Sequence, residues 1–193
     1  MKRFGFIVLA GAMLAYSGFA AKNDNDNTKQ HIDPYVNGGA NESNLVKQVR
    51  HQLVMLPYFT VFDDLGFTVD GGTVTLVGAV TNPVTKNDAA NVVKKVEGVT
   101  NVVNNIEVLP LSQMDWQIRR AMYRAIYGDP SIGTRYGYRA LPSIHIIVKN
   151  GNVRLEGVVA NEMDKNLINI RANSVPGVFH VTNDLRVEGK SVS

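Results

Sequence analysis

Residues 72–108 read GTVTLVGAVTNPVTKNDAANVVKKVEGVTNVVNNIEV, and residues 151–187 read GNVRLEGVVANEMDKNLINIRANSVPGVFHVTNDLRV. The second stretch repeats the first without a gap, 79 positions later. Fourteen positions are identical: Gly72, Val74, Leu76, Gly78, Val80, Asn82, Lys86, Asn87, Val96, Gly98, Val99, Val102, Asn104 and Val108. Most are alternating apolar residues, turn glycines or cap residues, and no Ser, His, Asp or Glu is shared. A repeat that keeps the scaffold without a reactive group favours a tandem binding module over an enzyme.

The first copy predicts a strand, a helix and a second strand. Apolar residues alternate through residues 74–80, as on one face of a strand. Asn82-Pro83 is typical of a helix start, Gly98 of a helix end, and residues 99–108 alternate again. Before the copy, the turn at residues 70–72 predicts a hairpin with a strand over residues 67–69.

A helix is predicted at the start of each unit. In the first unit, apolar residues recur at helical spacing between the expected cap Ser43 and Pro57. In the second, the helix is expected over residues 114–127, followed by strands at 144–148 and 153–159. A helix over 161–175 and a strand over 178–187 complete the pattern. Six extra residues are expected within 128–141, because the two first helices align at an offset of 73, not 79.

The order in each unit is therefore helix, strand, strand, helix, strand. Strands with one apolar face need a helical layer on that face, so we expect an α+β fold of two tandem, small two-layer sandwiches. The predicted organisation is a signal peptide at 1–20, a disordered polar arm at 21–42, and domains at 43–109 and 112–188. The short link at residues 109–111 predicts that the domains dock.

The leader is typical of export. Lys2 and Arg3 precede an apolar run, and Gly18 and Ala20 fit a cleavage after Ala20. The alternative is an uncleaved anchor, although the run over residues 4–21 is at the short limit for spanning a bilayer. The chain contains no cysteine, which excludes disulfides and a lipidated N-terminus. We expect a periplasmic protein that is not a lipoprotein.

Positive charge is concentrated in the second half of the chain. Residues 43–111 carry five basic and six acidic groups, whereas residues 112–193 carry eleven and seven. The formal net charge of +3 becomes +1 if Lys2 and Arg3 are removed with the leader. A basic surface is therefore expected in the second domain.

Nothing in the chain predicts catalysis, a cofactor or a metal site. The histidines, His31, His51, His145 and His180, do not have metal-ligand spacing and do not align across the repeat. There is no nucleophile motif, phosphate-binding loop or paired-carboxylate motif. The adjacent acids Asp63 and Asp64 are interpreted as a solvated turn. We therefore expect no enzymatic activity.

Residues 116–139, WQIRRAMYRAIYGDPSIGTRYGYR, break the symmetry between the domains. Aromatic and arginine residues gather on the side of the helix opposite its apolar face, whereas the equivalent face of the first domain has no aromatic residue. The candidate lipid or partner surface comprises Trp116, Arg119, Arg120, Tyr123, Arg124 and Tyr127, with Arg135 and Arg139 on the insert. Such a face suits an anionic headgroup surface. The alternative is that the rings pack against the first domain or under the insert.

Six glycines are interpreted as structural. They are Gly72, Gly78, Gly98, Gly151, Gly157 and Gly177. Gly78 and Gly157 fall inside strands, where a glycine indicates a bulge or a close approach. Packing of a helix over each glycine is the favoured interpretation, ahead of a ligand site.

The motifs VTLVGAV and VRLEGVV, followed by a helix and then by VEGVTNVVNNIEV and VPGVFHVTNDLRV, resemble the BON domain. The resemblance covers residues 43–109 and 112–188. It implies a periplasmic protein of envelope maintenance or osmotic stress that binds phospholipid or another envelope component, and it supplies no catalytic residues. The insert at 128–141 departs from the family pattern.

Two functions remain open from the sequence. The first is an exported, non-enzymatic module that binds anionic phospholipid or another envelope component. The alternative is a structural or adaptor protein that docks an envelope protein, or self-associates, through the second domain. Export argues against nucleic acid as the partner of the arginine and aromatic residues.

Overall fold

The computed structural model describes residues 32–34, 43–139 and 142–189. The first unit contains α1 (Asn44–Val54), β1 (Asp64–Asp70), β2 (Thr73–Val80), α2 (Pro83–Val93), β3 (Asn101–Asn104) and β4 (Glu107–Val108). The predicted caps form, because Ser43 accepts a hydrogen bond from the N–H of Val46 and Asn82 accepts one from Val84.

The second unit repeats this order and adds one helix. Its elements are α3 (Gln113–Tyr127), α4 (Pro130–Tyr136), β5 (Ile144–Lys149), β6 (Asn152–Val159), α5 (Glu162–Asn173), β7 (His180–Asn183) and β8 (Arg186–Val187). The extra helix α4 lies in the predicted insert. The predicted α+β fold of two tandem units is confirmed.

Each unit holds a small mixed sheet with the second strand at its centre. β2 pairs with β1 antiparallel and with β3 and β4 parallel, and β6 pairs with β5, β7 and β8 in the same way. The chain reverses between the first two strands through a short turn, whereas a parallel neighbour requires the crossover helix α2 or α5. Both cores lie between these sheets and their helices.

The last strand of each unit is broken in the middle, where one continuous strand was predicted. The repeated residue Asn104 accepts from the N–H of Ile106 and donates to the Lys86 carbonyl of α2 at 2.9 Å. Asn183 makes the same pair of bonds, to Leu185 and to the Lys165 carbonyl of α5. Because the side chain bonds its own backbone two residues on, the ladder is interrupted at this point. This explains why asparagine recurs in both copies.

The interpretation that helices pack over Gly78 and Gly157 is wrong. A Cβ on Gly78 would lie 2.2 Å from the Asp64 carbonyl oxygen, and a Cβ on Gly157 would lie 2.2 Å from that of Ser143. The approaching atoms therefore belong to the backbone of the neighbouring strand or its start. The φ angles of +117° and +114° also place both glycines where side chains are rarely accommodated. The other four glycines interpreted as structural also have positive φ.

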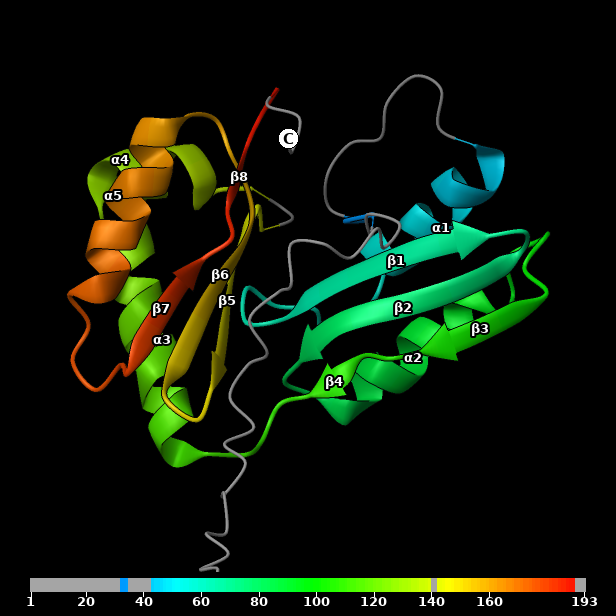
Figure 1. Ribbon diagram of the computed structural model, residues 1–193, viewed down its shortest axis with the longest axis horizontal. Coiled ribbons are helices and arrows are strands. Elements are labelled where there is room, and N and C mark those ends of the chain that lie inside the picture. Colours follow the sequence, from blue (N-terminus) through cyan, green and yellow to red (C-terminus); the bar gives the residue numbers. More distant parts are fainter. Residues whose placement is uncertain (1–31, 35–42, 140–141, 190–193) are drawn as a thin grey trace, which may run out of the picture.

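The two units dock through the outer face of β5. In Figure 1 the helices of the second unit lie on the side of its sheet that faces away from the first unit. Ile147 projects from the other side of β5 and is fully buried against Ala79 and Leu109. The Lys149 ammonium lies 2.6 Å from the Glu107 carboxylate across the same junction. The predicted docking of the domains therefore has an apolar centre and an ion pair at its edge.

Part of the arm predicted to be disordered is placed against the domains. Ile32 pairs antiparallel with Phe67 of β1, and Asp33 forms an ion pair with Arg186. The prediction of disorder therefore fails at residues 32–34, because an isolated apolar residue inserts beside the first core. The predicted signal peptide at 1–20, and the remainder of the arm at 21–31 and 35–42, lie outside the described residues.

Candidate functional site

The outer side of α3 carries several of the residues predicted to form a surface. Arg120 and Arg124 are exposed one turn apart. The Trp116 and Tyr123 side chains are partly accessible, at 47% and 44% of their surface. These positions recur every three or four residues, which places them on one side of a helix.

Arg119 does not belong to this surface, which corrects the prediction. It lies on the side of α3 that also carries Met122 and Ile126, and only 4% of it is exposed. Its guanidinium donates to the Val148 carbonyl of β5 at 2.7 Å. Burial lowers the pKa of Arg119, while the charge of Asp115 opposes that shift. An arginine remains protonated at neutral pH, so a buried cation lies between α3 and the sheet.

The aromatic side chains of α3 contact the first unit, as the packing alternative proposed. The Phe62 ring meets Trp116 and Tyr123 edge-on, with centroids 5.7 Å and 6.4 Å apart. Tyr127 is half-buried and donates from its hydroxyl to the Ile144 carbonyl at 2.8 Å. Burial raises the pKa of Tyr127, so the hydroxyl keeps its proton and this bond at any physiological pH. Tyr127 therefore acts mainly in packing, whereas Trp116 and Tyr123 contact Phe62 and also keep nearly half of their surface exposed.

The insert is held firmly to α5 at both of its ends. At the start of α4, Asp129 accepts two hydrogen bonds from Arg171, at 2.8 and 3.0 Å. At the end of α4, Arg135 and the Tyr136 hydroxyl both donate to Asp164 of α5. Tyr136 is buried, and burial together with this bond raises its pKa.

Arg135, predicted as part of the candidate surface, is exposed, and its guanidinium forms an ion pair with the Asp164 carboxylate of α5. Arg139 is exposed, with its guanidinium carbon 5.6 Å from the centroid of the Tyr136 ring. This distance is within the range of a cation–π contact.

An exposed group of residues remains, which we call the basic–aromatic face: Arg120, Tyr123, Arg124, Tyr138 and Arg139. A shallow hollow of about 350 Å³ lies within it between α3 and α4. Tyr123, Arg124, Tyr127 and Tyr138 line the hollow, together with Gly128, Gly133 and Gly137. The three glycines present little side-chain bulk, which leaves room for a small polar group beside Arg124.

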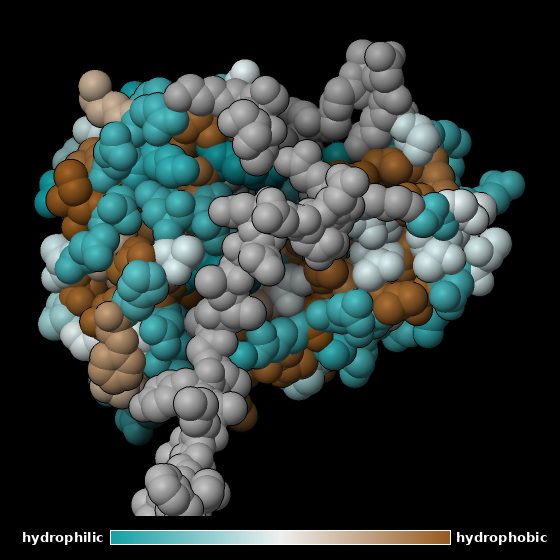
Figure 2. Space-filling view, viewed as in Figure 1, coloured by the Kyte–Doolittle hydropathy of each residue, from teal (hydrophilic) through white to brown (hydrophobic). Residues whose placement is uncertain are grey.

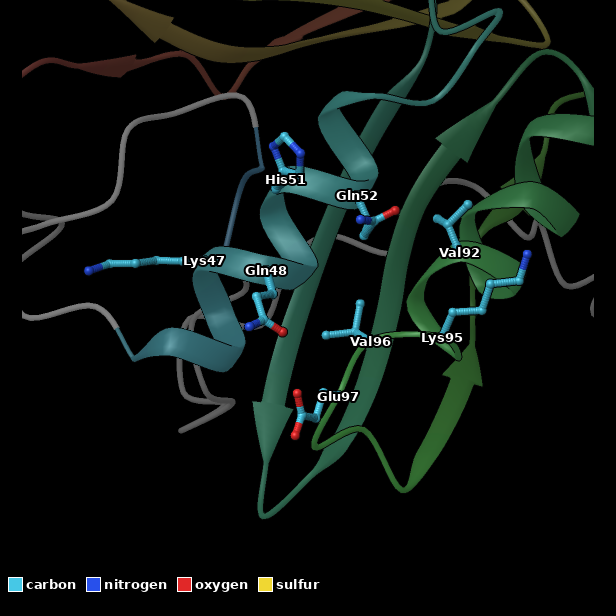
Figure 3. Close-up of a pocket in the computed structure, with 8 residues that line it drawn as sticks. All are labelled: Lys47, Gln48, His51, Gln52, Val92, Lys95, Val96 and Glu97. Atoms are coloured by element: carbon cyan, nitrogen blue, oxygen red, sulfur yellow. The ribbon is translucent and has the colours of Figure 1, made fainter.

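A second hollow, of about 540 Å³, lies between α1 and the end of α2 in the first unit. Polar and charged residues, among them Gln48, Gln52 and Glu97, line it together with Val92 and Val96 (Figure 3). The Lys47 and Lys95 side chains point away from one another, so their charges do not converge on one position. We therefore give this groove no binding role.

The sequence interpretation missed that Asp63, Asp64 and Asp115 are buried, so the interpretation of Asp63 and Asp64 as a solvated turn is wrong. Asp63, interpreted as solvated, is fully buried and accepts from the N–H and hydroxyl groups of both Thr60 and Thr81, at 2.6–2.8 Å. Asp115 accepts from the N–H groups of Asn150 and Gly151 at 2.9 and 2.8 Å, and so binds α3 to the hairpin turn. Thr60, three residues before Asp63, was a local signal that its carboxylate could be hydrogen-bonded. The second partner, Thr81, is 18 residues away and is brought near only by the fold.

The described residues contain no group of three or more histidines and carboxylates arranged to hold a metal ion. Within the same part of the chain, every helix is too short or too polar to cross a bilayer.

The repeat, the mixed sheets and the two helix-covered cores define a protein of two tandem α+β units. The BON domain model matches residues 41–110 and 118–189. The chain therefore belongs to the BON family, with two such domains in tandem. BON domains are thought to bind membranes, and the family is without known catalytic activity.

The osmotically inducible protein Y of Escherichia coli is 26% identical over 195 aligned positions, which cover 94% of this chain and 93% of that protein. Among solved structures, two of CdsD, a structural protein of the type III secretion system of Chlamydia trachomatis, each cover 76% of this chain. These two structures are 13% and 12% identical in sequence to this chain, and the matches cover 94% and 98% of their own chains. The TM-scores are 0.29 and 0.30. The chain is therefore a distant homologue of osmotically inducible protein Y over nearly its full length.

Proposed function

We propose that this protein is an exported, periplasmic, non-enzymatic binding protein of the cell envelope, acting in envelope maintenance or osmotic stress. We propose that its ligand is an anionic phospholipid surface. The observation that carries the proposal is the basic–aromatic face, where Arg120 and Arg124 are exposed beside Tyr123 and Tyr138. The similarity to an osmotically inducible protein supports the stress role.

The chemistry of this face suits lipid headgroups. Arginine is planar and can donate two parallel hydrogen bonds to one phosphate. Tyrosine rings favour the boundary between headgroups and acyl chains, because one end of the ring is apolar and the other is polar. Each basic group near an anionic surface contributes about 1 kcal/mol, so Arg120, Arg124 and Arg139 together provide reversible binding that depends on salt.

Co-sedimentation with phosphatidylglycerol-containing vesicles tests this proposal. Reversing the charge in the double variant Arg120→Glu and Arg124→Glu removes about 2 kcal/mol of attraction, which corresponds to at least about thirtyfold weaker binding. The matched control is Lys94→Glu with Lys95→Glu, which makes the same change of charge at exposed positions of the first unit. Equal loss in both variants would attribute binding to net charge and refute a specific face.

A second function, docking of an envelope protein or of another copy, is favoured by a separate observation. Met163 and Ile170 lie two turns apart on α5 and are 78% and 63% exposed. Figure 2 shows apolar side chains over this helix on the outer surface of the second unit. Light scattering on the wild type and on Met163→Glu with Ile170→Glu distinguishes the two functions. A dimer that the double variant dissociates, without vesicle binding, would favour the adaptor.

A further inference from the structure

Both units receive an incoming segment at the same position of the repeat, on the free edge of the first strand. In β1, the Phe67 N–H donates to the Ile32 carbonyl at 2.9 Å, and the Phe67 carbonyl accepts from Ile32 at 2.5 Å. Ile146 of β5 stands 79 positions after Phe67, which is the spacing of the repeat. Its N–H donates to the Val61 carbonyl at 2.8 Å.

The incoming residue also fills an apolar gap in each unit. Ile32 packs against the core of the first unit, and Val61 packs against that of the second. Both residues are aliphatic and β-branched, although the segments around them are unrelated in sequence. Each unit therefore has an edge slot, consisting of the backbone groups at Phe67 or Ile146 and the apolar gap beside them.

The slot of the second unit is occupied by the first unit itself. Val61 lies just before β1, and the neighbouring Phe62 contacts the aromatic side chains of α3. The adjacent Asp63 is fixed by its bonds to Thr60 and Thr81. This segment cannot leave without separating the two units.

The slot of the first unit is occupied by the arm, and its chemistry is more specific. The Asp33 carboxylate accepts from Arg186 of β8 at 3.0 Å, while its carbonyl accepts from Arg50 of α1 at 2.6 Å. Asp33 and Pro34 are buried. Two arginines from different units thus converge on the residue that follows the aliphatic one.

We propose that the edge slot of the first unit is a strand-addition site for an extended peptide carrying a β-branched aliphatic residue followed directly by a carboxylate. The residues Ile32 and Asp33 occupy the site as a tethered competitor. Strand addition draws affinity from backbone hydrogen bonds and specificity from the side-chain pockets. This binding site is separate from the basic–aromatic face and does not depend on lipid binding.

Fluorescence anisotropy with a labelled peptide of residues 28–37, TKQHIDPYVN, tests the proposal on the full chain. The variant Ile32→Asp empties the slot, because a carboxylate is disfavoured in the apolar gap. A tethered segment competes at an effective concentration on the order of millimolar, so the variant should bind the peptide at least about tenfold more tightly than the wild type. The matched control Leu111→Asp places the same carboxylate at a fully exposed aliphatic position and should bind like the wild type.

Two altered peptides test the stated chemistry. In one peptide the isoleucine is replaced with aspartate, and in the other the aspartate that follows it is replaced with lysine. Neither altered peptide should bind to the Ile32→Asp variant of the protein. If circular dichroism shows that this variant is unfolded, Asp33→Lys is used, since it places a cation beside Arg50 and Arg186 and also releases the arm.

Amide hydrogen exchange at Phe67 gives an independent measurement. The Phe67 N–H should be protected in the wild type, exchange faster in the emptied variant, and regain protection when the peptide is added. Equal peptide binding to wild type and variant overturns the proposal, as does exchange at Phe67 that does not change among the three states.

Discussion

Replacing Gly157 with alanine tests whether strand geometry or helix packing requires glycine at this position. The φ of +114° lies in a region that costs a residue with a side chain about 1–3 kcal/mol. The new Cβ would also lie 2.2 Å from the Ser143 carbonyl oxygen, so β5 and β6 must separate locally by about 1 Å to restore ordinary contact. That movement weakens the 2.8 Å bond from Val158 N–H to the same oxygen, worth about 1 kcal/mol.

We therefore expect Gly157→Ala to lower the free energy of unfolding by about 2–4 kcal/mol. Gly177→Ala is the matched control, because its φ is +82° and a Cβ there meets no atom within 4 Å. Backbone strain alone should cost the control about 1–2 kcal/mol. Urea denaturation, followed by circular dichroism and by the fluorescence of Trp116, measures both values. A loss in Gly157→Ala no larger than in Gly177→Ala would show that the close approach of the strands contributes nothing.

Two further predictions concern contacts of the second unit. Phe62→Ala should shift the emission of Trp116, the chain's single tryptophan, to longer wavelength and lower stability by about 2–3 kcal/mol, whereas Phe179→Ala at an exposed site should do neither. The hydrogen bond from Arg171 lowers the pKa of Asp129, so its stabilisation is present above about pH 4 and is lost as pH falls through the lowered folded-state pKa. Arg171→Gln should therefore flatten the acid side of the stability profile measured by urea denaturation, and an unchanged profile would contradict this assignment.

Local signals in the sequence predicted most of the fold. The alternation in residues 74–80 and 153–159 predicted the central strands, and the caps at Ser43 and Asn82 placed two helix starts. These signals were sufficient because strand alternation and helix capping depend on residues that are close in the chain. The repeat then extended the same pattern to the second unit, and the offset between the copies located the insert that forms α4.

The candidate surface was predicted only in part. The helical period separated Arg120 and Arg124 from the apolar side of α3, but Arg119 lies at its margin, where the period does not decide burial. The sequence pattern predicts that Arg135 lies at the surface, but it does not predict the ion pair with Asp164, because that residue is 29 positions away. The contacts of Trp116 and Tyr123 with Phe62 likewise depend on the docking of the two units, and no local pattern indicates these contacts.

The sequence by itself therefore determined the tandem repeat, the α+β class, the order of elements and the presence of a basic, aromatic helix. Tertiary structure decided which charged groups are buried, because residues such as Asp63 and Thr81 become neighbours only when β1 and β2 pair. It also decided that Ile32 and Val61 enter equivalent edges of the two sheets. Local patterns specify elements through neighbouring residues, whereas burial and edge pairing depend on distant segments whose meeting no short pattern encodes.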